Sequence, residues 1–350
     1  MTSAPTPDPI PGSNAKLPAS LSLGVIGNCA FSALIDAHGR LVWSCLPRFD
    51  GDPVFNALLD DSEKGSDFAI ELEAFSHAEQ MYVPNTAVLR TRLYDQHGQA
   101  VEITDFAPRF TSRDRDFRPM MIVRRVRPLH GWPRIRVRVN PRFDWGRTEP
   151  HITRGSNHLR YVGPDLTLRL NTNAPLSHVL AQTAFVLPGE LNFLLGSDET
   201  LQTGIAETAR DFEQKTTDYW RQWTRRLALP LEWQDAVIRA AITLKLSLYE
   251  DTGAIIAAMT TSIPEAPGSS RNWDYRYCWL RDAFFVVRAL NSLSEVATME
   301  DYLRWMSNVV IDSQGGHIQP LFGIGLEKSL PESFVDNLPG YRGMGPVRVG

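Results

Sequence analysis

The sequence predicts an antiparallel β-sandwich followed by a helical domain. Short β-like runs separated by turn signals fill residues 21–195, with no long helical pattern between them. From about Thr208 onward, apolar residues recur at helical spacing instead. A chain of 350 residues has room for two domains of this kind.

Two hairpins mark the predicted sandwich. Their paired runs are residues 31–36 with 40–45 and residues 87–94 with 99–106. Gly39 and Gly98 each lie in the short turn between two runs, where a positive φ angle is expected.

Further strands are expected along the same half of the chain. They are residues 119–126, 135–140, 158–161, 166–170, 178–187 and 191–195. In residues 134–139, arginines alternate with β-branched residues, which predicts a strand with one solvated face. Many short strands with regular turns are typical of a β-sandwich, which we assign to residues 21–207.

A charged helix is expected between the two halves, in residues 209–227. It carries four aromatic residues, Phe212, Tyr219, Trp220 and Trp223. Such rings can bind carbohydrate, but on a connecting helix they more often pack between domains. We therefore assign residues 208–230 as a linker helix.

The remaining residues, 231–350, are expected to be largely helical. After Pro230, one apolar stripe consists of Ala236, Val237, Ala240, Ala241, Leu244 and Leu248. Two more apolar helices are expected in residues 282–293 and 299–311. Thr298, with Asp301 three residues later, is expected to cap the second of them.

Composition and charge argue against several classes of protein. Residues 1–20 are rich in Pro, Ser and Thr and lack an apolar stretch, which predicts a disordered leader rather than a signal peptide. The formal net charge of −4 argues against nucleic-acid binding. No apolar run approaches the length of a membrane span. The three cysteines and the scattered histidines show no metal-binding spacing, so we expect no metal or cofactor and a cytoplasmic location.

The most informative segment is residues 271–283, the motif, which holds four aromatic residues, three arginines and two aspartates. Buried arginines and aspartates need partners, so this mixture is poor material for a hydrophobic core. It suits a sugar site, because rings cover the apolar face of a pyranose and Arg–Asp pairs bind its hydroxyls. The structural alternative for Arg281 and Asp282 is an ion pair at a helix N-terminus. Cys278 has no evident histidine partner and is expected to be a small buried residue.

Several segments resemble glycoside hydrolase family 15, the glucoamylases, with bacterial trehalases and glucodextranases beside them. They are residues 260–265, 267–268 and 271–282, the stretch from 26–28 to 50–51, and residues 340–343 and 346–350. The resemblance covers nearly the whole chain. It implies a β-sandwich followed by an (α/α)6 barrel around a pocket.

The resemblance also implies an activity. Family members remove glucose from the non-reducing ends of α-glucosides with inversion at the anomeric carbon, so the implied partner is an oligosaccharide or disaccharide α-glucoside. By the family pattern, Arg281 and Asp282 would hold hydroxyls of the terminal glucose in the −1 subsite. Trp279 and Tyr275 would form its aromatic wall, and Arg348 would be a further pocket residue.

The catalytic residues that the resemblance implies are not identified in this chain. Inversion needs an acid and a base roughly 6.5–9.5 Å apart, and both family glutamates lie further along the barrel than Gly350. Glu265, Glu327 and Glu332 are the only tempting substitutes, and loop glutamates are usually just solvated. We therefore expect an N-terminal portion with an incomplete barrel.

Three functions follow as hypotheses. The first is inverting hydrolysis of terminal α-linked glucose by the full-length form. The second is a non-catalytic carbohydrate- or partner-binding remnant that functions as it stands. The third is a glucoside phosphorylase on the same architecture, which ranks last because no distinctive phosphate cradle is visible. The sequence does not choose among α-1,4, α-1,6 and α,α-1,1 linkages, and it does not predict the oligomeric state.

Overall fold

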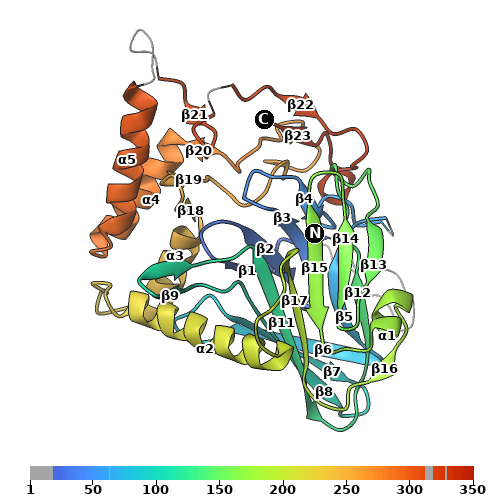
Figure 1. Ribbon diagram of the computed structural model, residues 1–350. Helices are drawn as coiled ribbons and strands as arrows, with labels where there is room; N and C mark the ends of the chain where they lie inside the picture. Colours follow the sequence, from blue (N-terminus) through green and yellow to red (C-terminus); the bar gives the residue numbers. More distant parts are fainter. Residues whose placement is uncertain (1–18, 63, 312–317, 328) are drawn as a thin grey trace, which may run out of the picture.

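The computed structural model describes residues 19–62, 64–311, 318–327 and 329–350 (Figure 1). The leader expected in residues 1–20 lies almost entirely outside this part of the chain. Ala19 is buried, and its carbonyl accepts a hydrogen bond from Arg342 Nε at 2.6 Å. The start of the described chain is thus held against the C-terminal segment.

Two antiparallel sheets make up the first half of the chain (Figure 1). The seven-stranded sheet has the order β1-β2-β3-β5-β12-β16, with β4 paired to β3. Its strands are β1 (Leu23–Gly27), β2 (Ser32–Asp36), β3 (Leu41–Cys45), β4 (Pro53–Phe55), β5 (Phe68–Leu72), β12 (Arg134–Val139) and β16 (Phe185–Val186). The eight-stranded sheet has the order β13-β14-β15-β17-β11-β8-β7-β6. Its strands are β6 (Phe75–Tyr82), β7 (Leu89–Asp95), β8 (Ala100–Phe106), β11 (Met121–His130), β13 (His151–Arg154), β14 (His158–Val162), β15 (Thr167–Thr172) and β17 (Leu191–Ser197).

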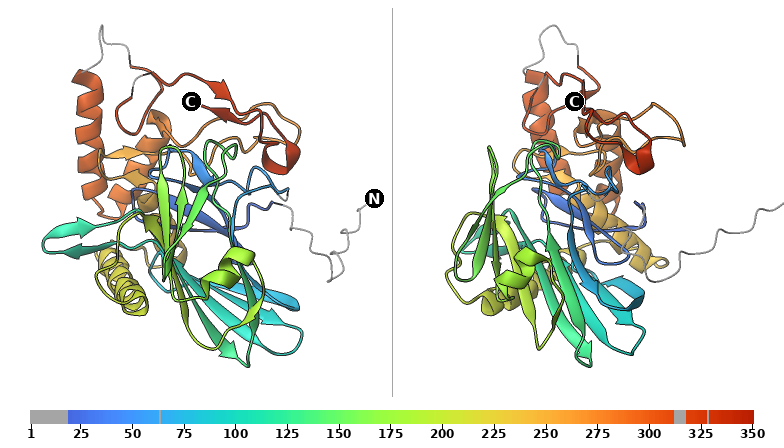
Figure 2. Two further views of the ribbon diagram at one scale, coloured as in Figure 1. Left: turned by 45° about the vertical axis from the view of Figure 1, so that its right-hand side comes forward. Right: turned by 90° about the vertical axis from the view of Figure 1, so that its right-hand side faces the viewer.

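The two sheets face each other across one hydrophobic core (Figure 2), which confirms the predicted β-sandwich. Fully buried members of this core are Ile35, Phe68 and Val137 from the first sheet and Ile103, Val126 and Leu195 from the second. Both predicted hairpins form, as β2–β3 and β7–β8, with φ angles of 74° at Gly39 and 79° at Gly98.

The strand expected in residues 178–187 is wrong for its first part. Leu176–Ala181 form a short helix, α1, and only Phe185–Val186 form a strand. Pro175 fixes the backbone just before this helix, and its two buried residues lie three positions apart, at helical spacing. The mixture of apolar and polar residues in this segment fits both the period of a strand and the period of a helix.

The arginine-rich strand is as predicted. On β12 the apolar residues are buried, while the arginines between them lie on the other face of the sheet. Arg138 there forms ion pairs with Asp67 at 2.8 Å and with Glu71 at 2.6 Å. Acidic residues on and next to the neighbouring strand β5 therefore neutralise arginine charge on β12.

Helix α2, Ile205–Thr224, lies along the sandwich and leads to the helical half (Figure 1). Its first turns pack on the second sheet through Ala209 and Phe212. Trp220 and Trp223 are buried in a cluster that also contains side chains of the first sheet and of the later helices. The expected packing role of these two rings is confirmed. A hairpin of β9 (Phe110–Ser112) and β10 (Arg115–Phe117) projects beside α2 (Figure 2).

Three shorter helices follow, α3 (Gln234–Leu246), α4 (Leu280–Ser292) and α5 (Ala297–Ile311). The apolar stripe expected on α3 is confirmed in part. Its members Ala241 and Leu248 are buried, whereas Ala236 and Ala240 are exposed, and Ile238 and Ile242 are buried in their place. The larger isoleucine side chains gain more from burial than alanine does, so they set the face that packs inward.

The cap expected at α5 is also corrected. Thr298 lies within the first turn and is fully buried, and its backbone N–H donates to Glu295 Oε2 at 3.1 Å. The carboxylate of Glu295 therefore serves the cap, because its side chain reaches the free N–H groups of the first turn.

Short strand pairs and a helical turn lie between and after these helices. They are β18 (Leu248–Tyr249) with β19 (Ala254–Ile255), β20 (Cys278–Trp279) with β21 (Leu321–Phe322), β22 (Ser333–Phe334) with β23 (Arg348–Val349), and the 3-10 helix η2 (Tyr341–Gly343). Pairing of β20 with β21 brings the later loop against the motif just before α4 begins.

Helices α4 and α5 expose large apolar side chains. The exposed fractions are 54% for Phe284, 59% for Phe285, 54% for Leu303 and 80% for Ile311. None of the helices in the described part of the chain has the length and apolarity needed to cross a membrane. Within the same residues, no group of three or more potential ligand side chains is placed to hold a metal ion.

Candidate sugar-binding site

Side chains of the motif alternate between two faces. Those of Asn272, Asp274, Arg276 and Cys278 are buried, whereas those of Trp273, Tyr275, Tyr277 and Trp279 are partly exposed. The backbone here is largely extended and bonded to the preceding loop, with Thr261 bridged to Asp274. An extended chain sends alternate side chains to opposite sides, so the motif separates a buried polar face from an aromatic face.

The buried face holds an ion pair that fastens the motif to the sandwich. Arg276 Nη2 lies 2.7 Å from Asp274 Oδ2, and Arg276 Nε lies 2.9 Å from Asp274 Oδ1. Arg276 Nη1 also donates to the Gly51 carbonyl at 2.7 Å, and its guanidinium lies 4.9 Å from the ring centre of Trp145. These two charges are core residues with full partners, so the expectation that the whole motif is unsuited to a core is wrong.

Cys278 belongs to the same buried face. Its side chain is fully buried, and burial raises the pKa of the thiol to about 12. A thiol with such a pKa stays protonated at neutral pH and is a poor nucleophile. The expectation of a small buried residue is confirmed.

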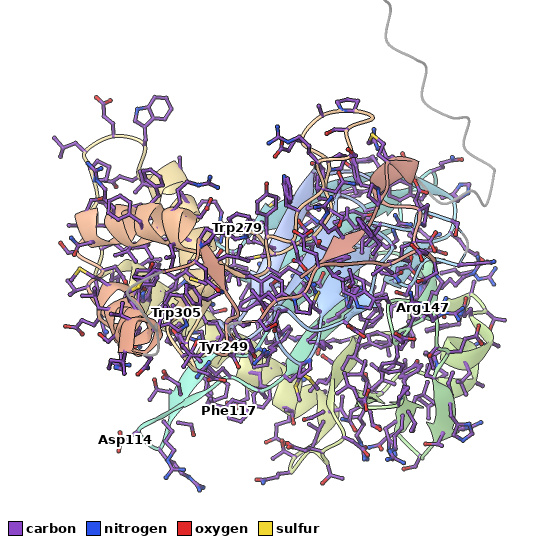
Figure 3. The ribbon with its side chains drawn as sticks, turned by 90° about the horizontal axis from the view of Figure 1, so that it is seen from above. Asp114, Phe117, Arg147, Tyr249, Trp279 and Trp305 are labelled. Atoms are coloured by element: carbon purple, nitrogen blue, oxygen red, sulfur yellow. The ribbon has the colours of Figure 1, made fainter. Side chains whose placement is uncertain are left out.

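The aromatic face brings together the two rings expected to form a wall. The ring centres of Tyr275 and Trp279 lie 5.8 Å apart, with their planes inclined by 43°. Trp279 is labelled in Figure 3. Its Nε1 donates to the Asp274 carbonyl at 3.2 Å, which fixes the orientation of the indole. Burial raises the pKa of Tyr275, and the nearby carboxylates of Glu265 and Asp282 raise it further. The Tyr275 hydroxyl therefore stays a neutral hydrogen-bond donor.

Arg281 and Asp282 follow directly, in the first turn of α4. Arg281 Nη2 lies 3.1 Å from Asp282 Oδ2, and the two side chains are 70% and 33% exposed. An exposed pair of this kind contributes little to stability. Both side chains remain open to solvent, where they can bind vicinal hydroxyls of a ligand.

Arg348 stands at the other end of the motif. Its guanidinium lies 4.7 Å from the ring centre of Trp273 and 5.4 Å from that of Phe334. Its Nη1 pairs with Glu332 Oε2 at 3.2 Å, and its backbone N–H donates to Ser262 Oγ at 2.7 Å. Its Nε is buried and has no hydrogen-bond partner among the described residues. The structure thus places Arg348 against Trp273, with one donor unused.

Each loop glutamate is held by a partner. Glu265 accepts from Trp273 Nε1 at 3.0 Å and pairs with Arg271 at 3.0 Å. Glu327 pairs with Arg48 at 2.6 Å, and Glu332 pairs with Arg348. Burial alone would raise the pKa of Glu327, but the hydrogen bond from Arg48 lowers it below its ordinary value. A general acid needs the opposite shift.

One contribution to this region comes from the sandwich. The loop after β3 carries Arg48, which pairs with Asp50 at 2.6 Å and with Glu327 at 2.6 Å. Its guanidinium lies 5.9 Å from the ring centre of Tyr249. Sequence reasoning did not find Arg48, because its partner Glu327 is 279 residues away along the chain.

Two family profiles match the chain. Residues 232–350 match the family profile described as glycosyl hydrolases family 15, and residues 13–178 match the one described as trehalase-like, N-terminal. The resemblance to glycoside hydrolase family 15 is confirmed by these matches.

Curated relatives are similar over almost the whole chain. A trehalase of Thermoplasma volcanium is 29% identical over 338 residues, which cover 93% of this chain and 53% of that protein. A trehalase of Mycolicibacterium smegmatis is 30% identical over 95% of this chain and 54% of its own length. Trehalase 1 of Sulfolobus acidocaldarius is 32% identical over 94% and 55%, respectively. The chain spans about half the length of these relatives.

Proposed function

We propose that this chain, whose residues 232–350 belong to the glycosyl hydrolases family 15, is the sugar-binding portion of an inverting α-glucoside hydrolase. The observation that carries the proposal is the position of the Tyr275–Trp279 ring pair next to the exposed pair of Arg281 and Asp282. The rings offer an apolar surface to one face of a glucosyl unit. The charged pair offers donors and an acceptor to its hydroxyls. We assign Arg348 to the same pocket, supported by the contact of its guanidinium with the Trp273 ring of the motif.

Trehalose is the first substrate to test. Three relatives are named trehalases, and the N-terminal match is described as trehalase-like. Other α-linked glucose disaccharides and oligosaccharides are the remaining members of the proposed class. A cytoplasmic location is also proposed, supported by three buried cysteines that form no disulfide.

We propose that residues 231–350 form the start of an (α/α)6 barrel, after a sandwich in residues 21–207 and a linker in residues 208–230. The exposed apolar residues of α4 and α5, such as Phe285 and Ile311, support this, because further barrel helices would cover them. Inversion requires an acid and a base about 6.5–9.5 Å apart across the bond that is cleaved. We assign neither role to Glu265, Glu327 or Glu332, since each is held by a positively charged partner.

The 350-residue chain is expected to release no glucose from trehalose, maltose or isomaltose, because no carboxylate in it is assigned as acid or base. Glucose is measured with a coupled enzymatic assay, and a form extended to the length of the relatives serves as the positive control. Glucose release that is lost on Glu265→Gln, Glu327→Gln or Glu332→Gln would overturn the assignment. Formation of glucose 1-phosphate in the presence of phosphate would indicate a phosphorylase instead.

Binding tests the sugar site separately from catalysis. Asp282→Asn is expected to weaken trehalose binding to this site by about ten- to hundredfold, because it removes a charged hydrogen-bond acceptor. The affinity is measured by isothermal titration calorimetry of the 350-residue chain. Asp211→Asn is the matched control, since Asp211 forms an exposed ion pair with Lys215 on α2. Equal affinities for both variants would show that Asp282 does not hold the sugar.

A further inference from the structure

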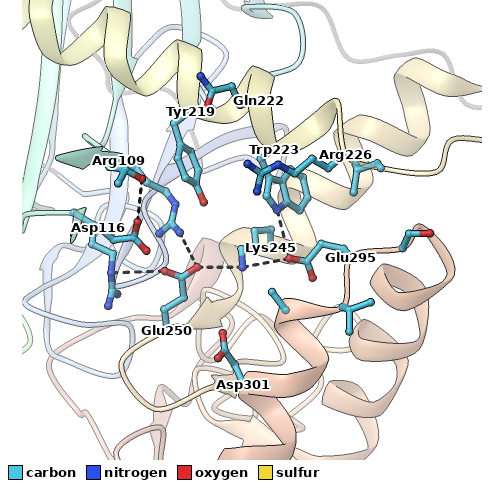
Figure 4. Close-up of a pocket in the computed structure, with 16 residues that line it drawn as sticks. Arg109, Asp116, Tyr219, Gln222, Trp223, Arg226, Lys245, Glu250, Glu295 and Asp301 are labelled. Carbon is cyan, nitrogen blue, oxygen red and sulfur yellow. Dashed lines mark hydrogen bonds and ion pairs between the residues drawn. The ribbon is translucent and has the colours of Figure 1, made fainter. Parts of the chain in front are cut away.

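A cavity lies away from the motif, beside α2 (Figure 4). It has a volume of about 640 Å³, within the range of small-molecule sites. Its walls come from α2 and the residues just after it, from the β9–β10 hairpin and its flanks, from the end of α3 and the segment after it, and from the α4–α5 connection with the start of α5. Arg281 and Asp282 lie in the first turn of α4, and this cavity lies beyond its last turn, so roughly 15 Å of helix separates the two sites.

We propose that this α2 cavity binds a small neutral polyhydroxylated molecule, a mono- or disaccharide. Three features of its lining carry the proposal: balanced charge, a fixed network of buried ionic groups, and an aromatic wall with an unused hydroxyl. The site is independent of the proposed −1 subsite and does not rest on it.

Charge balance favours a neutral ligand. The lining contains four basic residues, Arg109, Arg118, Arg226 and Lys245, and four acidic residues, Asp116, Glu250, Glu295 and Asp301. Formal charges therefore cancel, and the lining contains both donors and acceptors. An anion such as phosphate would meet carboxylates, and a metal cation would meet the basic side chains. A polyol matches this lining, because each hydroxyl both donates and accepts.

The floor of the cavity is rigidly built. Lys245 Nζ lies 3.1 Å from Glu250 Oε1 and 3.6 Å from Glu295 Oε1. Arg109 Nη2 lies 2.7 Å from Glu250 Oε1, and Trp223 Nε1 donates to Glu295 Oε1 at 3.4 Å. The side chains of Lys245, Glu250, Glu295 and Arg109 are each at most 10% exposed. Groups fixed in this way lose little freedom when a ligand arrives.

Aromatic side chains of α2 form one wall. Tyr219 and Trp223 lie one turn apart on the helix and both line the cavity. The Tyr219 ring stacks on the Arg109 guanidinium, 4.6 Å from the ring centre. Its hydroxyl points toward Glu250 and Lys245 (Figure 4), and no group of the described residues forms a hydrogen bond with it. This hydroxyl is therefore available to a ligand.

Variants of the α2 cavity test the proposal in the Asp282→Asn background, which weakens sugar binding at the other proposed site. The titrants are glucose, trehalose and inorganic phosphate, each followed by calorimetry. The Asp282→Asn chain is expected to keep one sugar site. Adding Arg226→Ala is expected to weaken sugar binding about tenfold, and adding Tyr219→Phe about threefold to tenfold. Arg225→Ala is the matched control, because Arg225 is exposed next to Arg226 and does not line the cavity.

The outcomes separate the two proposed sites. Loss of all sugar binding in Asp282→Asn would overturn the α2 cavity site and leave the −1 subsite standing. Sugar binding that responds to the cavity variants but not to Asp282→Asn would support the α2 cavity site and overturn the −1 subsite. Phosphate binding that is lost in Arg226→Ala, without any sugar binding, would also overturn the proposal. Since Arg226 is exposed, its variant is expected to fold, and circular dichroism checks this.

Discussion

Asp274→Asn is expected to lower the free energy of unfolding by about 3–5 kcal/mol. Asp274 and Arg276 are 3% and 1% exposed, and two hydrogen bonds join their side chains. Asparagine keeps the shape of aspartate but not its charge, so the guanidinium would stay buried without a counter-charge. The loss includes contacts between the motif and the sandwich, because Arg276 also donates to the Gly51 carbonyl.

The motif provides its own control for this variant. Arg281 and Asp282 are also an Arg–Asp pair, but their side chains are 70% and 33% exposed. Asp282→Asn is therefore expected to cost less than about 1 kcal/mol. Both free energies are obtained from urea denaturation followed by tryptophan fluorescence and circular dichroism. Similar losses in the two variants would mean that Asp274 and Arg276 do not form the buried fastening described here.

Local pattern was sufficient for most of the sandwich. The hairpin expected from residues 87–94 and 99–106 forms as Leu89–Asp95 and Ala100–Phe106, because alternating side chains and a turn glycine act within a few residues. Local pattern did not predict the structure of residues 178–187 correctly. Its helix depends on packing against β12, which local sequence does not report.

The candidate site was predictable where its members are neighbours in sequence. Tyr275, Trp279, Arg281 and Asp282 lie within eight residues and share one region of the surface. The inward turn of Arg276 was not predicted, because its partner Gly51 is 225 residues away. A signal was nevertheless present: from residue 272 to 279 polar or small residues alternate with aromatic ones. An alternation of period two predicts two faces, and only one of them can bind a ligand.

Glu250→Gln is expected to lower the free energy of unfolding by about 3–5 kcal/mol at pH 7, because it too leaves a buried arginine without its carboxylate. Glu250 is the one carboxylate shared by three cations of the α2 cavity floor, Arg109 at 2.7 Å, Lys245 at 3.1 Å and Arg118 at 3.6 Å. The variant leaves Arg109 without an acidic partner among the described residues, while Lys245 keeps Glu295 at 3.6 Å. Glu232→Gln is the matched control, because Glu232 is exposed.

The effect of Glu250 should also depend on pH in a defined direction. Burial alone would raise its pKa, but Arg109 and Lys245 outweigh burial and lower the pKa from 4.5 to about 2. A carboxyl group with a depressed pKa in the folded state stabilises the protein above its unfolded pKa, and this stabilisation is lost as the pH falls toward 2. At about 1.4 kcal/mol per pKa unit, the loss between pH 4.5 and pH 2 amounts to roughly 3 kcal/mol.

The comparison of pH profiles isolates this contribution. Other carboxylates are titrated in the same range, so the unfolding free energy of every variant falls with acid. The fall from pH 4.5 to pH 2 should be shallower by about 3 kcal/mol in Glu250→Gln than in the unmodified chain, because glutamine has no proton to gain. Glu232→Gln should follow the unmodified chain. Parallel profiles for Glu250→Gln and the unmodified chain would mean that Arg109 and Lys245 do not hold the Glu250 carboxylate in its charged form. The floor of the α2 cavity would then lack the negative charge at its centre.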